Sequence, residues 1–118
     1  MANRHRGEIE VEIGGRRYAL CLTLGALAEL EHAFGAHDLV DLTRRFEQGR
    51  LSARDLIAII GCGLRGAGAP LSNEEVASLS VPDGLHGFVR IAAELLTATF
   101  GARAEGDEPA IPPEPQDA

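Results

Sequence analysis

Three glycines form the most specific chemical pattern in the sequence. Gly61, Gly63 and Gly66 have the G-x-G-x-x-G spacing of dinucleotide-binding turns, and an apolar run at residues 56–60 precedes them. In such a turn, the third glycine opens a helix whose N-terminus faces the pyrophosphate. Here Gly66 begins the segment Gly-Ala-Gly-Ala-Pro, which cannot start a helix. We therefore interpret the glycines as a glycine-rich helix end, and we predict no nucleotide site and no cofactor.

The histidines and cysteines show no spacing that is typical of a catalytic or metal site. His32 and His37 are the only histidines near each other, and their separation is not the i, i+4 spacing of a helical ligand pair. Cys21 and Cys62 each lie in an apolar segment, which favours buried free thiols over a disulfide or a metal site. No serine, histidine and acid combine at a nucleophile turn. We predict that the protein is not an enzyme and holds no metal.

The charge is unevenly distributed along the 118 residues. The formal net charge is −7, and residues 102–118 hold five acidic residues, Arg103 and four of the six prolines. Removing their net charge of −4 leaves about −3 for the rest of the chain. An acidic, proline-rich composition does not offset the entropy cost of ordering. We predict a single domain over residues 1–101 and a disordered tail over residues 102–118.

This acidic balance also argues against nucleic acid as a partner. Arg44 and Arg45 lie in a region of short predicted helices, which admits a helix-turn-helix interpretation and a small DNA-binding regulator. Binding to DNA, however, requires clustered Lys and Arg to neutralise phosphates.

The first residues lack the apolar core of a signal peptide, and no apolar run approaches the roughly 18 residues of a membrane span. We expect a cytoplasmic protein with no membrane partner.

The N-terminal elements are predicted from the hydrophobic period, which changes at Thr23 from that of a strand to that of a helix. Residues 8–13 alternate glutamates with Ile and Val, and a Gly-Gly turn joins them to a second alternating stretch, residues 16–22. The pairing that this turn sets places Val11 opposite Tyr18 and Glu12 opposite Arg17. From Thr23 the period becomes helical. Thr23 is the predicted N-cap, Gly35 the predicted end, and the buried stripe is Leu24, Leu27, Leu30 and Phe34.

Four further helices follow from spacing and capping signals. His37 or Asp38 opens the second helix, which Gly49 closes. Ser52 and Ser72 begin Ser-x-x-acid capping boxes, for a central helix at residues 53–65 and a short one ending near residue 79. The last helix covers residues 85–100. The predicted buried residues are Leu39, Leu42 and Phe46 in the second helix and Leu85, Phe88, Val89, Ala92, Leu95, Leu96 and Thr99 in the last.

A lone hairpin is marginal in water, so its apolar face must be covered by helices. The predicted fold class is α+β, an N-terminal β-hairpin packed on four to five short α-helices, followed by a disordered acidic, proline-rich C-terminal tail.

Several segments, in this order and spacing, resemble the small gene transfer agent family that is related to phage tail assembly chaperones. The label of phage tail tube protein is also attached to that family. The resemblance covers about residues 4–101. It rests on residues 17–31 (RYxLxLTLGALAELE), Phe34-Gly35, residues 49–56 (GRLSARDL), residues 63–66 (GLRG) and residues 98–101 (ATFG).

The resemblance implies a function in assembling the tail of a phage-like particle. It implies a chaperone that binds the long, helix-forming tape-measure protein, alongside other tail proteins, in the cytoplasm or transiently on assembling particles. A structural tail component is the alternative. For the docking groove, our hypothesis is Phe88, Ile91, Leu95 and Leu96 of the last helix, with the hairpin edge as a second surface for strand addition or self-association. Ile91 lies partly off the predicted stripe, which leaves both core packing and partner contact open.

Overall fold

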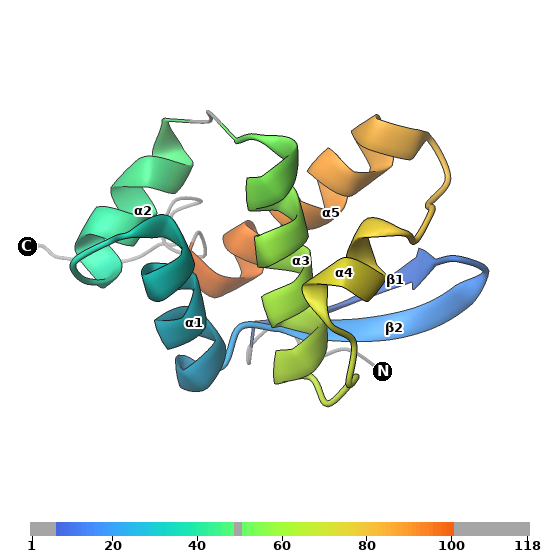
Figure 1. Ribbon diagram of the computed structural model, residues 1–118, viewed down its shortest axis with the longest axis horizontal. Helices are drawn as coiled ribbons and strands as arrows, with labels where there is room; N and C mark the ends of the chain where they lie inside the picture. Colours follow the sequence, from blue (N-terminus) through green and yellow to red (C-terminus); the bar gives the residue numbers. More distant parts are fainter. Residues whose placement is uncertain (1–6, 49–50, 101–118) are drawn as a thin grey trace, which may run out of the picture.

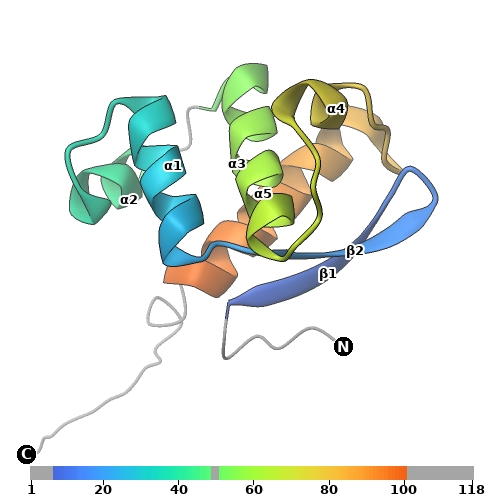
Figure 2. The same ribbon diagram turned by 60° about the horizontal axis from the view of Figure 1, so that its bottom comes forward.

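The structure is a computed structural model that describes residues 7–48 and 51–100. Its elements follow the order β1 (Glu8–Ile13), β2 (Arg16–Cys21), α1 (Leu24–Phe34), α2 (Leu39–Glu47), α3 (Ala53–Gly66), α4 (Asn73–Ala77) and α5 (Gly84–Phe100). The helices cover one face of the β1–β2 hairpin, and α3 lies in the middle (Figures 1 and 2). The predicted α+β class is confirmed. The predicted domain boundary and tail lie outside the described residues.

The hairpin has the predicted register. Val11 pairs with Tyr18 and Glu12 with Arg17, and both turn glycines have the positive φ of a tight hairpin turn. The ion pair differs from the expectation, because Arg17 reaches diagonally to Glu10 at 3.2 Å. Long side chains on one face of a sheet reach diagonal neighbours as readily as direct ones.

The first two helices begin at the predicted caps but bury narrower stripes than predicted. Thr23 accepts a hydrogen bond from the Ala26 backbone N–H, and Asp38 caps α2 by accepting from the Asp41 N–H. Leu24 is 79% exposed and Leu39 is 39% exposed, so their placement in buried stripes was wrong. Both residues occupy the first turn of their helix, directly after its cap. The predicted end of α2 at residue 49 lies outside the described residues.

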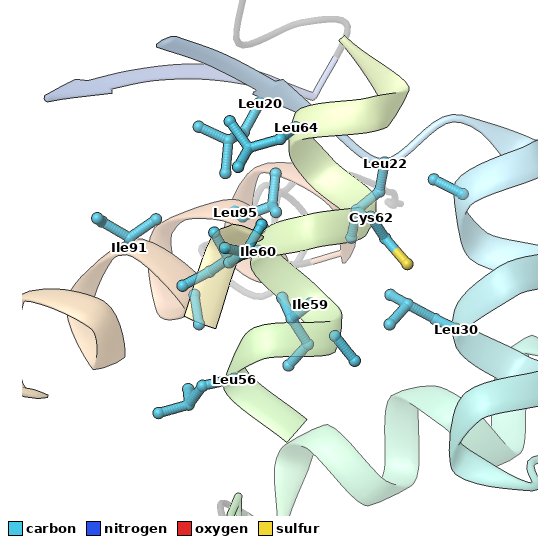
Figure 3. Packing of buried hydrophobic residues seen from close by; sticks show 14 of the residues in the cluster. Leu20, Leu22, Leu30, Leu56, Ile59, Ile60, Cys62, Leu64, Ile91 and Leu95 are labelled. Atoms are coloured by element: carbon cyan, nitrogen blue, oxygen red, sulfur yellow. The ribbon is translucent and has the colours of Figure 1, made fainter. Parts of the chain in front are cut away.

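The third helix is the centre of the fold. Its N-cap is Ser52, in a complete capping box with Asp55, and the helix continues one residue beyond the prediction, to Gly66. It packs against β2, α1, α4 and α5. Side chains from all these directions meet around it, and Figure 3 shows Leu20, Leu30 and Leu95 converging on α3 from β2, α1 and α5.

The glycines of α3 serve helix packing, and this is the physical reason for their spacing. A Cβ on Gly63 would overlap the Leu95 side chain, and a Cβ on Gly66 would overlap the backbone carbonyl oxygen of Cys21. All three glycines of the motif lie inside one helix. The residues that lead into them are helical and not a strand, and no helix begins at them, so this segment lacks the geometry of a dinucleotide-binding turn.

The last two helices begin near the predicted residues. α4 has its capping box at Ser72 but ends at Ala77, two residues short of the prediction. α5 begins at Gly84, after Asp83 with a φ of +71°, a conformation that Asp tolerates better than most residues. Its buried residues are Gly87, Ile91, Ala92 and Leu95. The predicted buried face of α5 was therefore wrong in part: Leu85 and Val89 are exposed, and Ile91 is in the core.

Candidate partner-binding surface

The four residues of the docking hypothesis do not share one environment. Leu95 is completely buried and Ile91 is 6% exposed, because both face the sheet and α3. Figure 3 shows Leu95 beside Ile60 of α3, and Ile91 further along α5. Phe88 and Leu96 are half-buried. Of the four, Phe88 lines one surface hollow and Ile91 lines another, and the partner-binding hypothesis for the whole set stays a prediction.

That hollow lies between α3, α4 and the start of α5. It has a volume of about 170 Å³ and its lining is apolar: Ala53, Leu56, Ile57, Ile60, Val76, Ala77, Leu85 and Phe88. The N-terminal half of α3 forms one wall and the first turns of α5 the other. Figure 1 shows where these helices lie. Its floor is part of the core, since Leu56, Ile60 and Val76 are buried.

The rim of this hollow exposes two large apolar side chains. Leu85 is 64% exposed and Val89 is 46% exposed, and they lie one turn apart on α5 on either side of Phe88 in sequence. Residues four apart on a helix lie on the same face. Leu85, Phe88 and Val89 therefore present a short apolar strip next to an apolar hollow. We call this strip and hollow together the apolar groove.

The sequence did not reveal this groove because it depends on which side of α5 is covered. Leu85 and Val89 fit a helical stripe as well as Ile91 does, so periodicity assigned them to the core. The available signal was Gly87, a small residue on the opposite side of the helix. A Cβ there would overlap the carbonyl oxygen of Pro82, so Gly87 marks the side of α5 that packs closely.

A second hollow, of about 940 Å³, lies between α1, α2 and the start of α3 and is charged. Arg44, Arg45 and Arg54 line it together with Asp41 and Asp55. Asp41 accepts a hydrogen bond from the His37 backbone N–H at 3.1 Å, and this bond lowers the pKa of the carboxyl, with Arg45 and Arg44 lowering it further. We call this the charged hollow.

Of the two cysteines, Cys62 is buried as predicted, whereas Cys21 is only half-buried. Cys62 is 2% exposed on the side of α3 that faces α1 (Figure 3), and burial raises the pKa of its thiol to about 12, helped by the nearby Glu29 carboxylate. A protonated, buried thiol is a poor nucleophile and metal ligand. Residues 7–48 and 51–100 contain no group of three or more metal-ligating side chains, and no helix among them has the length and apolarity to cross a bilayer.

Comparison with known proteins identifies the family. Residues 6–102 match the family described as phage tail tube protein, GTA-gp10. No curated protein and no solved structure shows a significant match to the chain. The match includes every element of the fold, from β1 to α5. The chain therefore belongs to the phage tail tube protein, GTA-gp10 family of tail-related proteins of gene transfer agents.

Proposed function

We propose that this protein is a tail assembly chaperone that binds the tape-measure protein of a phage-like particle until the tail tube forms around it. The family places the chain among tail proteins, and its resemblance to tail assembly chaperones suggests the client. In this proposal the protein acts by contact and not by catalysis. It works in the cytoplasm and on assembling particles, with the tape-measure protein and other tail proteins as its partners.

The observation that supports this proposal is the apolar groove. Its strip of Leu85, Phe88 and Val89 beside a hollow of about 170 Å³ fits one apolar side chain and one face of an amphipathic helix. A tape-measure protein is long and helical, so it offers many such faces. A contact of this size is small compared with a stable interface, which allows tube subunits to displace the chaperone.

A structural tail component is the second candidate, because the family description itself names a tail tube protein. A tube requires heterologous contacts that repeat from subunit to subunit. In the described residues, the sheet has two strands, and the outer face of its first strand carries Glu10 and Glu12. This polar ribbon gives weaker support to ring formation than the apolar groove gives to client binding. Sedimentation of the pure protein separates the two, because a tube subunit polymerises and a chaperone stays small.

Co-expression tests the chaperone function directly. The tape-measure protein is produced alone, with the wild-type chain, and with a variant that carries Leu85→Asp and Val89→Asp. Both residues are exposed, so the variant retains its fold. Leu24→Asp is the matched control, because Leu24 is an even more exposed leucine on α1 and does not line the groove. We expect soluble tape-measure protein with the wild type and the control, and aggregated protein without the chain or with the variant.

Two results would contradict parts of this proposal. Equal solubility of the tape-measure protein with and without the wild-type chain removes the chaperone function. Equal protection by the wild type and by the Leu85, Val89 variant leaves the function in place but removes the apolar groove as its site.

A further inference from the structure

The lining of the charged hollow carries three arginines, Arg44, Arg45 and Arg54, but only two carboxylates, Asp41 and Asp55. The Asp55 carboxylate accepts from the Ser52 backbone N–H at 3.0 Å, and Asp41 is held by the His37 N–H. Asp41 also pairs with Arg45 at 3.7 Å, whereas Asp55 is engaged at the start of α3. Arg44 keeps 66% of its side chain exposed and meets Asp41 only at 3.9 Å. Arg54 makes no ion pair with any residue of the described ranges.

The described chain ends beside this hollow. The ring of Phe100, the last residue of α5, lies 6.0 Å from the ring of Phe46 in α2. A smaller hollow of about 390 Å³ is lined by Phe100 and Arg44, among others, and Arg44 also lines the charged hollow. Residues that follow Phe100 therefore start from the same part of the surface that exposes Arg44.

The sequence after Phe100 has the opposite charge. Residues 101–118 contain Arg103 and five carboxylates, and the first three of these are Glu105, Asp107 and Glu108. Five residues span at most about 17 Å, so Glu105 can reach the surface around Arg44, and the next carboxylates can reach further along the hollow. An acidic chain needs no secondary structure of its own to lie along arginines, because the attraction is not directional.

We propose that the acidic C-terminal segment, residues 101–118, docks in cis on the charged hollow, with Glu105, Asp107 and Glu108 facing Arg44, Arg45 and Arg54. The segment then covers the face formed by α1, α2 and the start of α3, and it leaves the apolar groove on the other side of α3 open. This surface and its occupant do not depend on the client, so this inference and the chaperone function can fail separately.

Nuclear magnetic resonance of the full chain tests the docking. We compare the backbone amide shifts of the wild type with those of a variant that carries Glu105→Gln, Asp107→Asn and Glu108→Gln. A control variant neutralises Glu12, Glu74 and Glu94, which lie elsewhere on the surface. We expect the tail variant to change the amide shifts of Arg44, Arg45 and Arg54, and the control to leave them unchanged. At 1 M salt, where the Debye length is about 3 Å, the wild-type shifts should approach those of the tail variant.

A charge swap sharpens the test. Arg44→Glu with Arg54→Glu should remove the shift difference between wild-type and neutral tails. Adding Glu105→Lys, Asp107→Lys and Glu108→Lys to this background should restore a salt-sensitive shift at positions 44 and 54. Identical spectra of the wild type and the tail variant at low salt would overturn the proposal. Amide shifts that grow with protein concentration would also overturn it, since the occupant would then be the tail of another copy. So would equal shift changes of the wild type and the neutral-tail variant on addition of inorganic phosphate, because a docked tail should compete with the phosphate.

Discussion

The two halves of α3 have different surroundings. Residues 58–64 are buried on every side, between β2, α1 and α5. Residues 53–57 have the apolar groove on one side and the charged hollow on the other. One helix therefore serves as the centre of the core and as the wall between two surfaces. The comparison indicates that stability is concentrated in the second half of α3, while the proposed partner contacts lie at the first.

Truncation of core residues should produce the largest difference between the halves. Leu64 is completely buried and lies against Leu20 (Figure 3), so Leu64→Ala should lower the free energy of unfolding by about 2–5 kcal/mol. Ile57 is half-buried in the wall of the apolar groove, and Ile57→Ala should cost about 1 kcal/mol. Urea denaturation measures both. Leu64→Met, which conserves volume, is the control at the buried position, with an expected loss below about 1.5 kcal/mol. Equal losses for Leu64→Ala and Ile57→Ala would contradict the comparison.

Glycine substitution tests the close approach of the second half to the hairpin. A Cβ at Gly66 overlaps the Cys21 carbonyl oxygen, which is backbone and cannot rotate away, so Gly66→Ala should cost about 1–3 kcal/mol. Gly25 is the matched control, since it lies in α1 and its Cβ would meet nothing nearer than the Thr23 hydroxyl at 3.9 Å. Gly25→Ala should be neutral or stabilising by up to about 1 kcal/mol. Thermal unfolding measures the two shifts, and a stabilising Gly66→Ala would refute the packing role.

Arg65 closes the C-terminal end of α3, and its truncation should have an intermediate effect. Its guanidinium donates to the Glu29 carboxylate at 2.8 Å and to the Leu71 carbonyl at 2.8 Å, which ties α1 and the α3–α4 connection together. Arg65→Ala leaves these acceptors without their donor and should cost about 1–2 kcal/mol. Arg17→Ala removes an exposed ion pair on the hairpin and should cost no more than about 1 kcal/mol. Similar losses of unfolding free energy for Arg65→Ala and Arg17→Ala in urea denaturation would show that Arg65 does not tie these elements together.

The smallest effect should come from acid at the charged hollow. The pKa of the Asp41 carboxyl is lowered in the folded state. Its contribution to stability is therefore present above the pKa that this carboxyl has in the unfolded chain, and it is lost as pH falls below about 4. Asp41→Asn lacks this titration and should show a flatter decline of stability in that range. Unfolding curves of both proteins across acidic pH provide the measurement. If the unfolding free energies of the wild type and of Asp41→Asn decline in parallel with falling pH, the hydrogen bond from the His37 N–H contributes little to stability.

Local patterns in the sequence were sufficient for the elements and their caps. The alternation of residues 8–13 and the Gly-Gly turn determine the hairpin register, because side-chain period and turn length leave one pairing that buries Val11 opposite Tyr18. Ser52 and Ser72 determine where α3 and α4 begin, because the capping bonds lie within four residues. The family also followed from the order and spacing of short segments.

The tertiary structure alone decided which helix faces are covered. Helical periodicity allows one stripe through Leu85 and Val89 and another through Ile91 and Leu95, but the neighbouring elements determine which of the two faces water. The ion pair between Arg65 and Glu29 joins residues 36 positions apart, and the apolar groove brings α3 and α4 together with the start of α5. Periodicity is a property of one segment, whereas burial depends on long-range packing. For this reason the sequence predicted a hairpin sealed by helices, and only the packing around α3 revealed the apolar groove and the charged hollow.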